Sequence, residues 1–102
     1  MENDPEIRVQ VKKILGLVKS VAPGKSIELR VPPYGAIQCV AGSNHRRGTP
    51  PNTVEMSGRT LIRLISEPAL WNSLCESGEV RASGLLSDLS NVLAQAAVKY
   101  RA

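Results

Sequence analysis

The chain has 102 residues, the length of one small domain, and an apolar fraction of 42%, which is ordinary for a folded protein and excludes a disordered chain. Its net charge of +4 comes from 13 basic and 9 acidic residues scattered along the sequence, and its only aromatic residues are one Trp and two Tyr, so we expect no specific nucleic-acid partner. We therefore treat residues 1–102 as a single domain.

The first predicted element is a helix that ends at the APG stretch of residues 22–24. Asp4 is a good N-cap, and Pro5 suits the first helical position. Apolar residues recur at helical spacing and predict one buried stripe, made of Ile7, Val11, Ile14, Leu15 and Val18. Away from the stripe lie basic residues that predict at most weak contact with an anionic membrane surface: Arg8, Lys12, Lys13 and Lys19.

The pattern then alternates between apolar and polar residues, which is typical of strands. SIELRV (26–31) and AIQCV (36–40) flank the turn PPYG (32–35), so they predict a β-hairpin with one solvated face. GSNHRRGTPPN (42–52) contains two Gly and two Pro and predicts a loop. TVEM (53–56) predicts a short strand.

Two helical stretches follow. Ser57 is expected to cap a helix over residues 58–66 whose buried face carries Leu61, Leu64 and Ile65. Pro68 begins a second helical stretch that ends at Gly78. Its apolar stripe is predicted to consist of Trp71, Leu74 and Cys75.

The remaining residues predict one strand and one helix. EVRAS (79–83) is bounded by glycines and predicts a strand with Val80 and Ala82 facing inward. The last helix is expected to begin near Ser87 and to keep the helical period through Leu89, Val92, Leu93, Ala96, Ala97 and Tyr100. This order of elements predicts an α+β fold with a mainly antiparallel four- to five-stranded sheet covered by helices.

The second half of the chain resembles a known family. VEMSGRTLIRLI…LWNSLCESGEVRASGLLSDLSNVL (54–93) is similar to the carboxy-terminal half of the sterol carrier protein type 2 family, in which a helix ends in a GxhxhxG strand, where h is apolar or small. Here the strand positions are Gly78, Val80, Ala82 and Gly84. VPPYGAIQCV, HRRGTPPNTVE, VRASG and SDLS extend the resemblance to a shorter bacterial branch, over roughly residues 25–93.

The resemblance implies a non-enzymatic protein that binds an apolar ligand, such as a fatty acyl chain or a sterol-like lipid. A dry pocket of roughly 300 Å³ or more is then required between the sheet and the helices. The side chains expected to line it are Leu61, Leu64, Ile65, Trp71, Val80, Leu86, Leu89, Val92 and Leu93.

A second hypothesis is a structural or protein-interaction module that keeps this fold but fills its cavity. The lipid tunnels of better-known family members are rich in Phe and Met, whereas this chain has no Phe and only two Met. In that case the last helix is a candidate docking or homodimer surface, with Ala96 and Ala97 permitting close approach. A single Trp on a helix is also more often a core residue than a pocket wall.

The loop offers a possible anion contact. His45, Arg46 and Arg47 are candidates to hold a lipid headgroup or a phosphate, because Arg binds such oxygens bidentately. Charged loops are usually solvated connections, so we interpret HRRGTPPN chiefly as a rigid connector between the hairpin and the next strand.

No catalytic site is predicted. Strand alternation turns Cys39 inward, where a thiol is inert, and Ser87 and Asp88 are interpreted as a helix start. Cys39 and Cys75 form no CxxC motif and no His stands at ligand spacing, so we expect neither a metal nor another cofactor. MENDPEIR (1–8) is too polar for a signal peptide, which predicts a cytoplasmic protein with free thiols.

Overall fold

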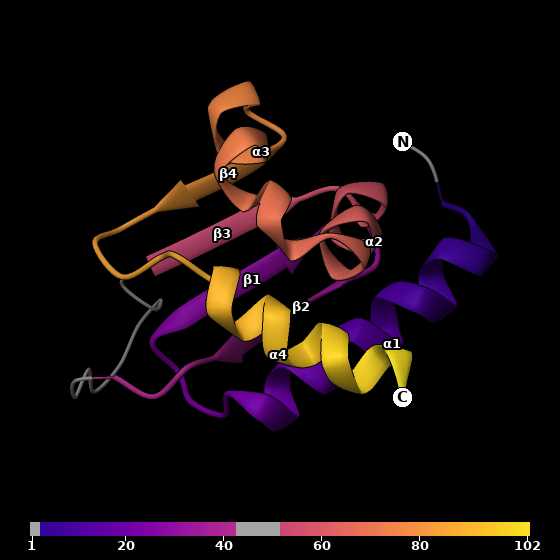
Figure 1. Cartoon of the computed structure of the whole chain (residues 1–102), viewed down its shortest axis with the longest axis horizontal. Coiled ribbons are helices and arrows are strands. Elements are labelled where there is room, and N and C mark those ends of the chain that lie inside the picture. Colours follow the sequence, from indigo (N-terminus) through magenta and orange to yellow (C-terminus); the bar gives the residue numbers. More distant parts are fainter. Residues whose placement is uncertain (1–2, 43–51) are drawn as a thin grey trace.

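A computed structural model describes residues 3–42 and 52–102. Its elements, shown in Figure 1, are α1 (Pro5–Val21), β1 (Ile27–Val31), β2 (Gly35–Cys39), β3 (Asn52–Met56), α2 (Gly58–Ser66), the 3₁₀ turn η1 (Pro68–Leu70), α3 (Trp71–Ser77), β4 (Val80–Ser83) and α4 (Ser90–Arg101). The predicted α+β class and the predicted order of elements are confirmed. Within the described ranges no helix is long and apolar enough to cross a bilayer.

The sheet has four strands in the order β2-β1-β3-β4 and is mixed. Both outer pairings, β1 with β2 and β3 with β4, are antiparallel, but the central pair of β1 and β3 is parallel. The register explains this difference from the mainly antiparallel expectation. Ile27 lies beside both Cys39, where β2 ends, and Asn52, where β3 begins. β2 therefore ends and β3 begins at the same end of the sheet, the end where β1 starts, so β3 runs in the direction of β1.

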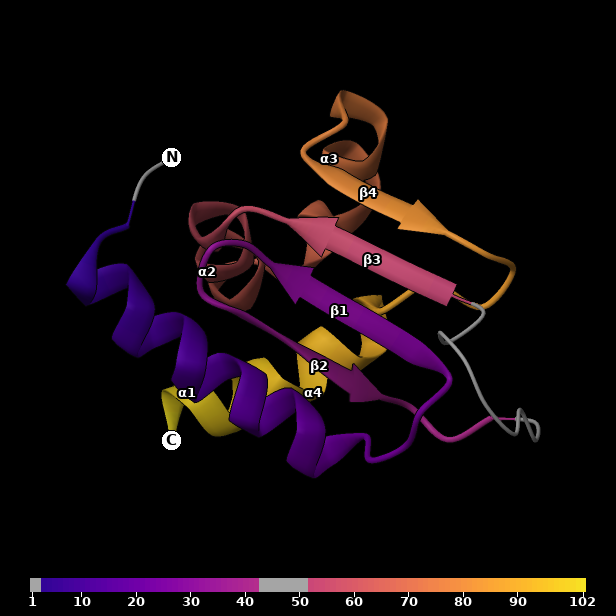
Figure 2. The same ribbon diagram turned by 180° about the vertical axis from the view of Figure 1, so that it is seen from behind.

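The helices cover one face of this sheet, and the other face is open. Figure 1 shows α2, α3 and α4 in front of the strands, and Figure 2 shows the opposite face without a covering helix. The open face is polar. Arg30, Glu55 and Arg81 stand in one row across three strands, and Glu55 accepts a 2.6 Å hydrogen bond from Arg81. Because these charges remain solvated, the apolar core is confined to the helical side.

Local capping signals place three helix ends as predicted. Asp4 Oδ1 accepts hydrogen bonds from the backbone N–H groups of Glu6 (2.8 Å) and Ile7 (3.3 Å) and thereby caps α1. Ser57 caps α2 by accepting from the Thr60 N–H. Gly78 ends α3 with a φ of 84°, a left-handed conformation that favours glycine.

The start of α4 differs from the prediction. The helix begins at Ser90 and not near Ser87. The Ser87 hydroxyl donates to the carbonyl of Gly84 (2.9 Å), and Asp88 Oδ1 accepts from the Ser90 N–H (2.8 Å). These bonds stabilise a turn in front of the helix, because short polar side chains compete with the helical backbone for hydrogen bonds.

Two predicted surfaces are also corrected. Ala82 was expected to face inward, and its pairing with the buried Val54 puts it on the same side of the sheet as Val80, but it is exposed on the edge strand β4. Ala96 and Ala97 were candidates for a docking or dimer surface, but both are completely buried within this chain. Their side of α4 packs against α1 and α2 and is therefore not available to a partner.

Candidate functional site

The residues predicted to line an apolar pocket are gathered by the fold, with one exception. Seven are buried in a single apolar cluster: Leu61, Leu64, Ile65, Trp71, Val80, Leu89 and Leu93. Val92 is half-buried and packs against this cluster. Leu86 is 63% exposed, because it lies in the turn before α4 and not on the helix.

Each helix contributes to this interior through its own apolar stripe. Leu61, Leu64 and Ile65 are three and four residues apart on α2, so they share one side of that helix. Trp71 begins α3 and is only 5% exposed. On α4 the buried residues Leu93, Ala96 and Ala97 have the same three- and four-residue spacing. Each of the three helices therefore buries an apolar side.

The interior is filled in this structure. The side chains of the cluster pack against one another, and none of the nine predicted residues lines the two surface hollows beside residues 32–34. Seven of the nine predicted residues therefore belong to one buried apolar core, and Val92 packs against it.

Two surface hollows lie beside the PPYG turn of residues 32–35, which the sequence pattern predicts as a turn but not as a site. A cleft of about 150 Å³ is lined by Ile7, Pro32, Pro33, Tyr34, Ser57, Gly58 and Arg59. A second hollow of about 310 Å³ is lined by Pro32, Met56, Ser57, Thr60, Glu79 and Arg81. The sequence features that could have predicted these hollows are the PPYG turn after β1 and the MSG stretch (56–58) at the end of β3. Their proximity depends on the parallel pairing of β1 and β3, which brings both strand ends together.

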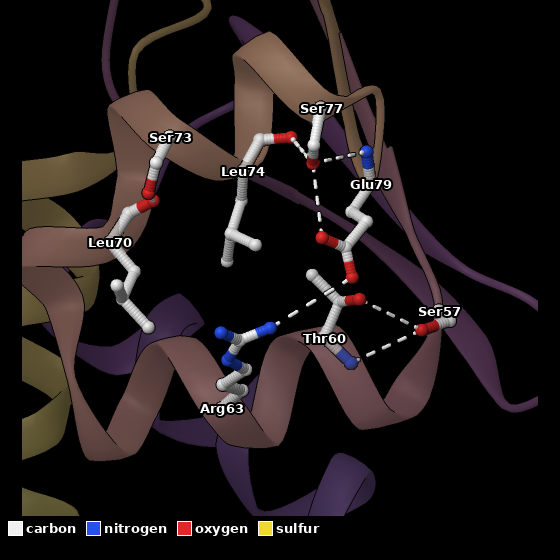
Figure 3. A network of polar contacts seen from close by, with 8 residues as sticks. All are labelled: Ser57, Thr60, Arg63, Leu70, Ser73, Leu74, Ser77 and Glu79. Atoms are coloured by element: carbon white, nitrogen blue, oxygen red, sulfur yellow. Dashed lines mark hydrogen bonds and ion pairs between the residues drawn. The ribbon is translucent and has the colours of Figure 1, made fainter.

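The polar groups beside the second hollow stabilise helix ends. The Ser57 hydroxyl donates to Thr60 Oγ1 (3.0 Å) and accepts from the Thr60 N–H (3.1 Å), as Figure 3 shows. At the other end of the network, Ser77 Oγ lies 3.0 Å from the carboxylate of Glu79. Arg63 is 4.0 Å from the same carboxylate. Each serine is bound to groups of its own helix terminus, so the network has the chemistry of capping.

The two thiols are poor nucleophiles at neutral pH. Burial raises the pKa of Cys39 from 9.0 to about 11. Burial, and secondly the carboxylate of Asp88, raises the pKa of Cys75. Both thiols are free and stay protonated at neutral pH, and the thiolate is the nucleophilic form.

Two further sequence predictions concern metals and anions. Among the residues that the structure describes, no group of three or more His, Cys, Asp or Glu side chains is placed to hold a metal ion. His45, Arg46 and Arg47, the candidate anion contact, lie outside the described residues.

Comparison with known proteins gives a family and a fold. The model of a family described as "Bacterial SCP ortholog" matches residues 4–94. No curated protein sequence matches the chain.

Two solved structures align with most of this chain. One is described as the UbiJ-SCP2 ubiquinone synthesis protein, and it superposes with a TM-score of 0.55 at 15% sequence identity, covering 100% of this chain and 98% of that one. The other is sterol carrier protein 2 from Yarrowia lipolytica in its apo form, with a TM-score of 0.45, 16% identity, and coverage of 92% of this chain and 81% of that one.

Proposed function

Because the chain belongs to the bacterial SCP ortholog family, we propose that it binds an apolar ligand, of the fatty acyl or sterol-like class, without catalysing a reaction. The ligand would occupy the layer between the sheet and helices α2, α3 and α4. We also place the protein in the cytoplasm, where its two free thiols would stay reduced.

The observation that supports the proposal is the composition of that layer. Leu61, Leu64, Ile65, Trp71 and Leu93 meet in one cluster of aliphatic and indole side chains. Such a surface offers an acyl chain or a sterol ring dispersion contacts and removal from water. Since the cluster is packed in the structure, binding requires α4 or α2 to move away from the sheet.

Trp71 provides a local test, because it is the only tryptophan of the chain and lies in the proposed site. Fatty acids that carry bromine on the acyl chain quench tryptophan fluorescence on contact. We expect saturable, one-to-one quenching of Trp71 by a brominated long-chain fatty acid, and no quenching by a brominated short-chain acid at the same concentration. Displacement by the unbrominated fatty acid should restore the emission.

The native mass of the purified protein adds a second test. A co-purifying lipid would appear as an additional mass that organic extraction removes. A mass equal to the polypeptide alone, combined with unchanged Trp71 emission in the titration, contradicts the proposal.

The second candidate is a structural or interaction module with a permanently filled interior. The complete burial of Leu61, Leu64 and Leu93 favours it. The same titration separates the two candidates, because a permanently filled core leaves Trp71 unquenched even at saturating fatty acid.

A further inference from the structure

The connection between β4 and α4, residues 84–89, carries two exposed leucines. Leu85 is fully exposed and Leu86 is 63% exposed, whereas Ser87 and Leu89 in the same connection are buried. The connection therefore follows the surface at the end of the sheet where β3 begins. It leads directly into α4, which forms one wall of the apolar interior.

A single buried side chain joins this connection to the sheet. Asn52, which is 4% exposed, accepts a hydrogen bond from the backbone N–H of Leu86 through Oδ1 (3.1 Å). Its Nδ2 donates to the carbonyl of Ser26 just before β1 (3.0 Å). The carboxamide of Asn52 thus links three chain segments, and each of its two polar atoms has a backbone partner.

This tie differs from the other side-chain bond of the connection. The Ser87 hydroxyl donates to the carbonyl of Gly84, so that bond lies entirely within residues 84–89. It shapes the turn but does not hold it on the sheet. Among the described residues, only Asn52 makes a side-chain hydrogen bond between the sheet and this connection.

We infer that Asn52 is a positioning residue that controls how fast the 84–89 connection moves aside to admit an apolar ligand. This inference depends on the proposed function. Because the interior is closed, a ligand reaches it only after one wall has moved, and α4 can separate from the sheet at its start only if the connection is released.

The physical consequence concerns rates more than affinity. In this proposal the bond between Asn52 and Leu86, which is present in the closed protein, re-forms once the ligand is inside, so it is broken only in the open state. Its contribution therefore cancels from the dissociation constant but remains in the barriers for entry and exit. Removing it should increase both rate constants about tenfold, the factor that corresponds to one hydrogen bond, with a dissociation constant that stays within about twofold.

Stopped-flow quenching of Trp71 by the brominated fatty acid measures both rate constants. Asn52→Ala should show the tenfold increase in association and dissociation. Ser87→Ala is the matched control, because it removes a bond inside the connection, and it should behave like the wild type. A weaker affinity without faster association in Asn52→Ala would indicate a merely structural role and would overturn the inference.

A second pair of variants tests the same bond from its other side and leaves the interior unchanged. Leu86→Pro removes the donor N–H, while Leu86→Ala shortens the same side chain and keeps the donor. Leu86→Pro should reproduce the faster uptake, and Leu86→Ala should not. This pair keeps the inference testable if Asn52→Ala does not fold.

Amide hydrogen exchange of the wild type provides a check without any substitution. The Leu86 amide should exchange more slowly than the Leu85 amide in spite of its exposed side chain, because Asn52 binds it. Equal exchange of the two amides would overturn the inference.

The two proposals fail in different ways. If the wild type shows no Trp71 quenching, the proposed function fails and the inference fails with it. If the wild type is quenched but both Asn52→Ala and Leu86→Pro leave the association rate unchanged, the proposed function stands and the role of Asn52 is refuted.

Discussion

Gly58 and Tyr34 are in such close contact that a larger residue at position 58 requires a neighbouring side chain to shift. A Cβ atom on Gly58 would lie 2.8 Å from Cε2 of the Tyr34 ring and 2.7 Å from Cγ2 of Ile7. Tyr34 is buried, and its hydroxyl accepts a hydrogen bond from the Asp4 N–H, which also fixes the start of α1. The contact thereby joins the β1–β2 turn, α1 and the first turn of α2.

Gly58→Ala should therefore destabilise the protein. Since the ring of Tyr34 and the side chain of Ile7 must both shift, we expect a loss of about 1–3 kcal/mol in the free energy of unfolding. Urea denaturation measures it. Gly16→Ala is the matched control, because nothing lies within 4 Å of its Cβ position on α1 and alanine is the better helix former. That variant should gain about 0.5–1 kcal/mol. Equal stabilities of the two variants would contradict the close contact.

The helix ends were predictable from sequence because capping is a local property. Asp4, Ser57 and Gly78 each act on groups within a few residues, so their identity alone places the ends of α1, α2 and α3. The parallel pairing of β1 with β3 depends on how distant segments meet, and alternation within each strand carries no information about it.

The candidate site was predictable only in part for a related reason. Helical periodicity identifies which side of α2, α3 and α4 is buried, and strand alternation identifies Val80 on β4. Eight of the nine predicted residues accordingly meet in one interior. Leu86 also fits the helical spacing toward Leu89 and Leu93, but it precedes the helix and faces solvent. How tightly the interior is packed depends on the distances between elements, which periodicity does not encode.

The buried thiol of Cys39 should make stability depend on alkaline pH. Its pKa in the folded protein is about 11, above the 9.0 of an exposed thiol, so the unfolded chain loses this proton first as the pH rises. The thiol's contribution is complete below pH 9.0 and is lost as the pH approaches 11, a change on the order of 2 kcal/mol.

Urea denaturation of the wild type and of Cys39→Ala, at pH values of about 8 and about 10.5 on the two sides of the unfolded thiol's pKa, isolates this effect. Other groups also titrate in this range, but they are common to both proteins. The wild type should lose more stability than Cys39→Ala between the two pH values. An equal loss would show that the Cys39 thiol does not stay protonated in the folded state.

The arginines of the loop should be dispensable for folding. Arg46 and Arg47 lie in a segment that we interpret as a solvated connector. Replacing both with Ala should therefore leave the free energy of unfolding, measured by urea denaturation, unchanged to within about 0.5 kcal/mol. If they bind a ligand carboxylate or phosphate, the same double variant should weaken fatty-acid binding in the Trp71 titration. Unchanged binding would eliminate the anion contact.

The close packing of α4 against its neighbours gives a last prediction. Ala97 is completely buried on the side of α4 that packs against α1 and α2, whereas Ala94 on the same helix is exposed. Ala97→Leu inserts three carbon atoms into a filled interior, so we expect a loss of about 1–3 kcal/mol in the free energy of unfolding. Ala94→Leu adds the same atoms toward solvent and should change stability by less than about 0.5 kcal/mol. A tolerated Ala97→Leu would instead mean that the interior has room to expand, which is the property that an apolar ligand needs.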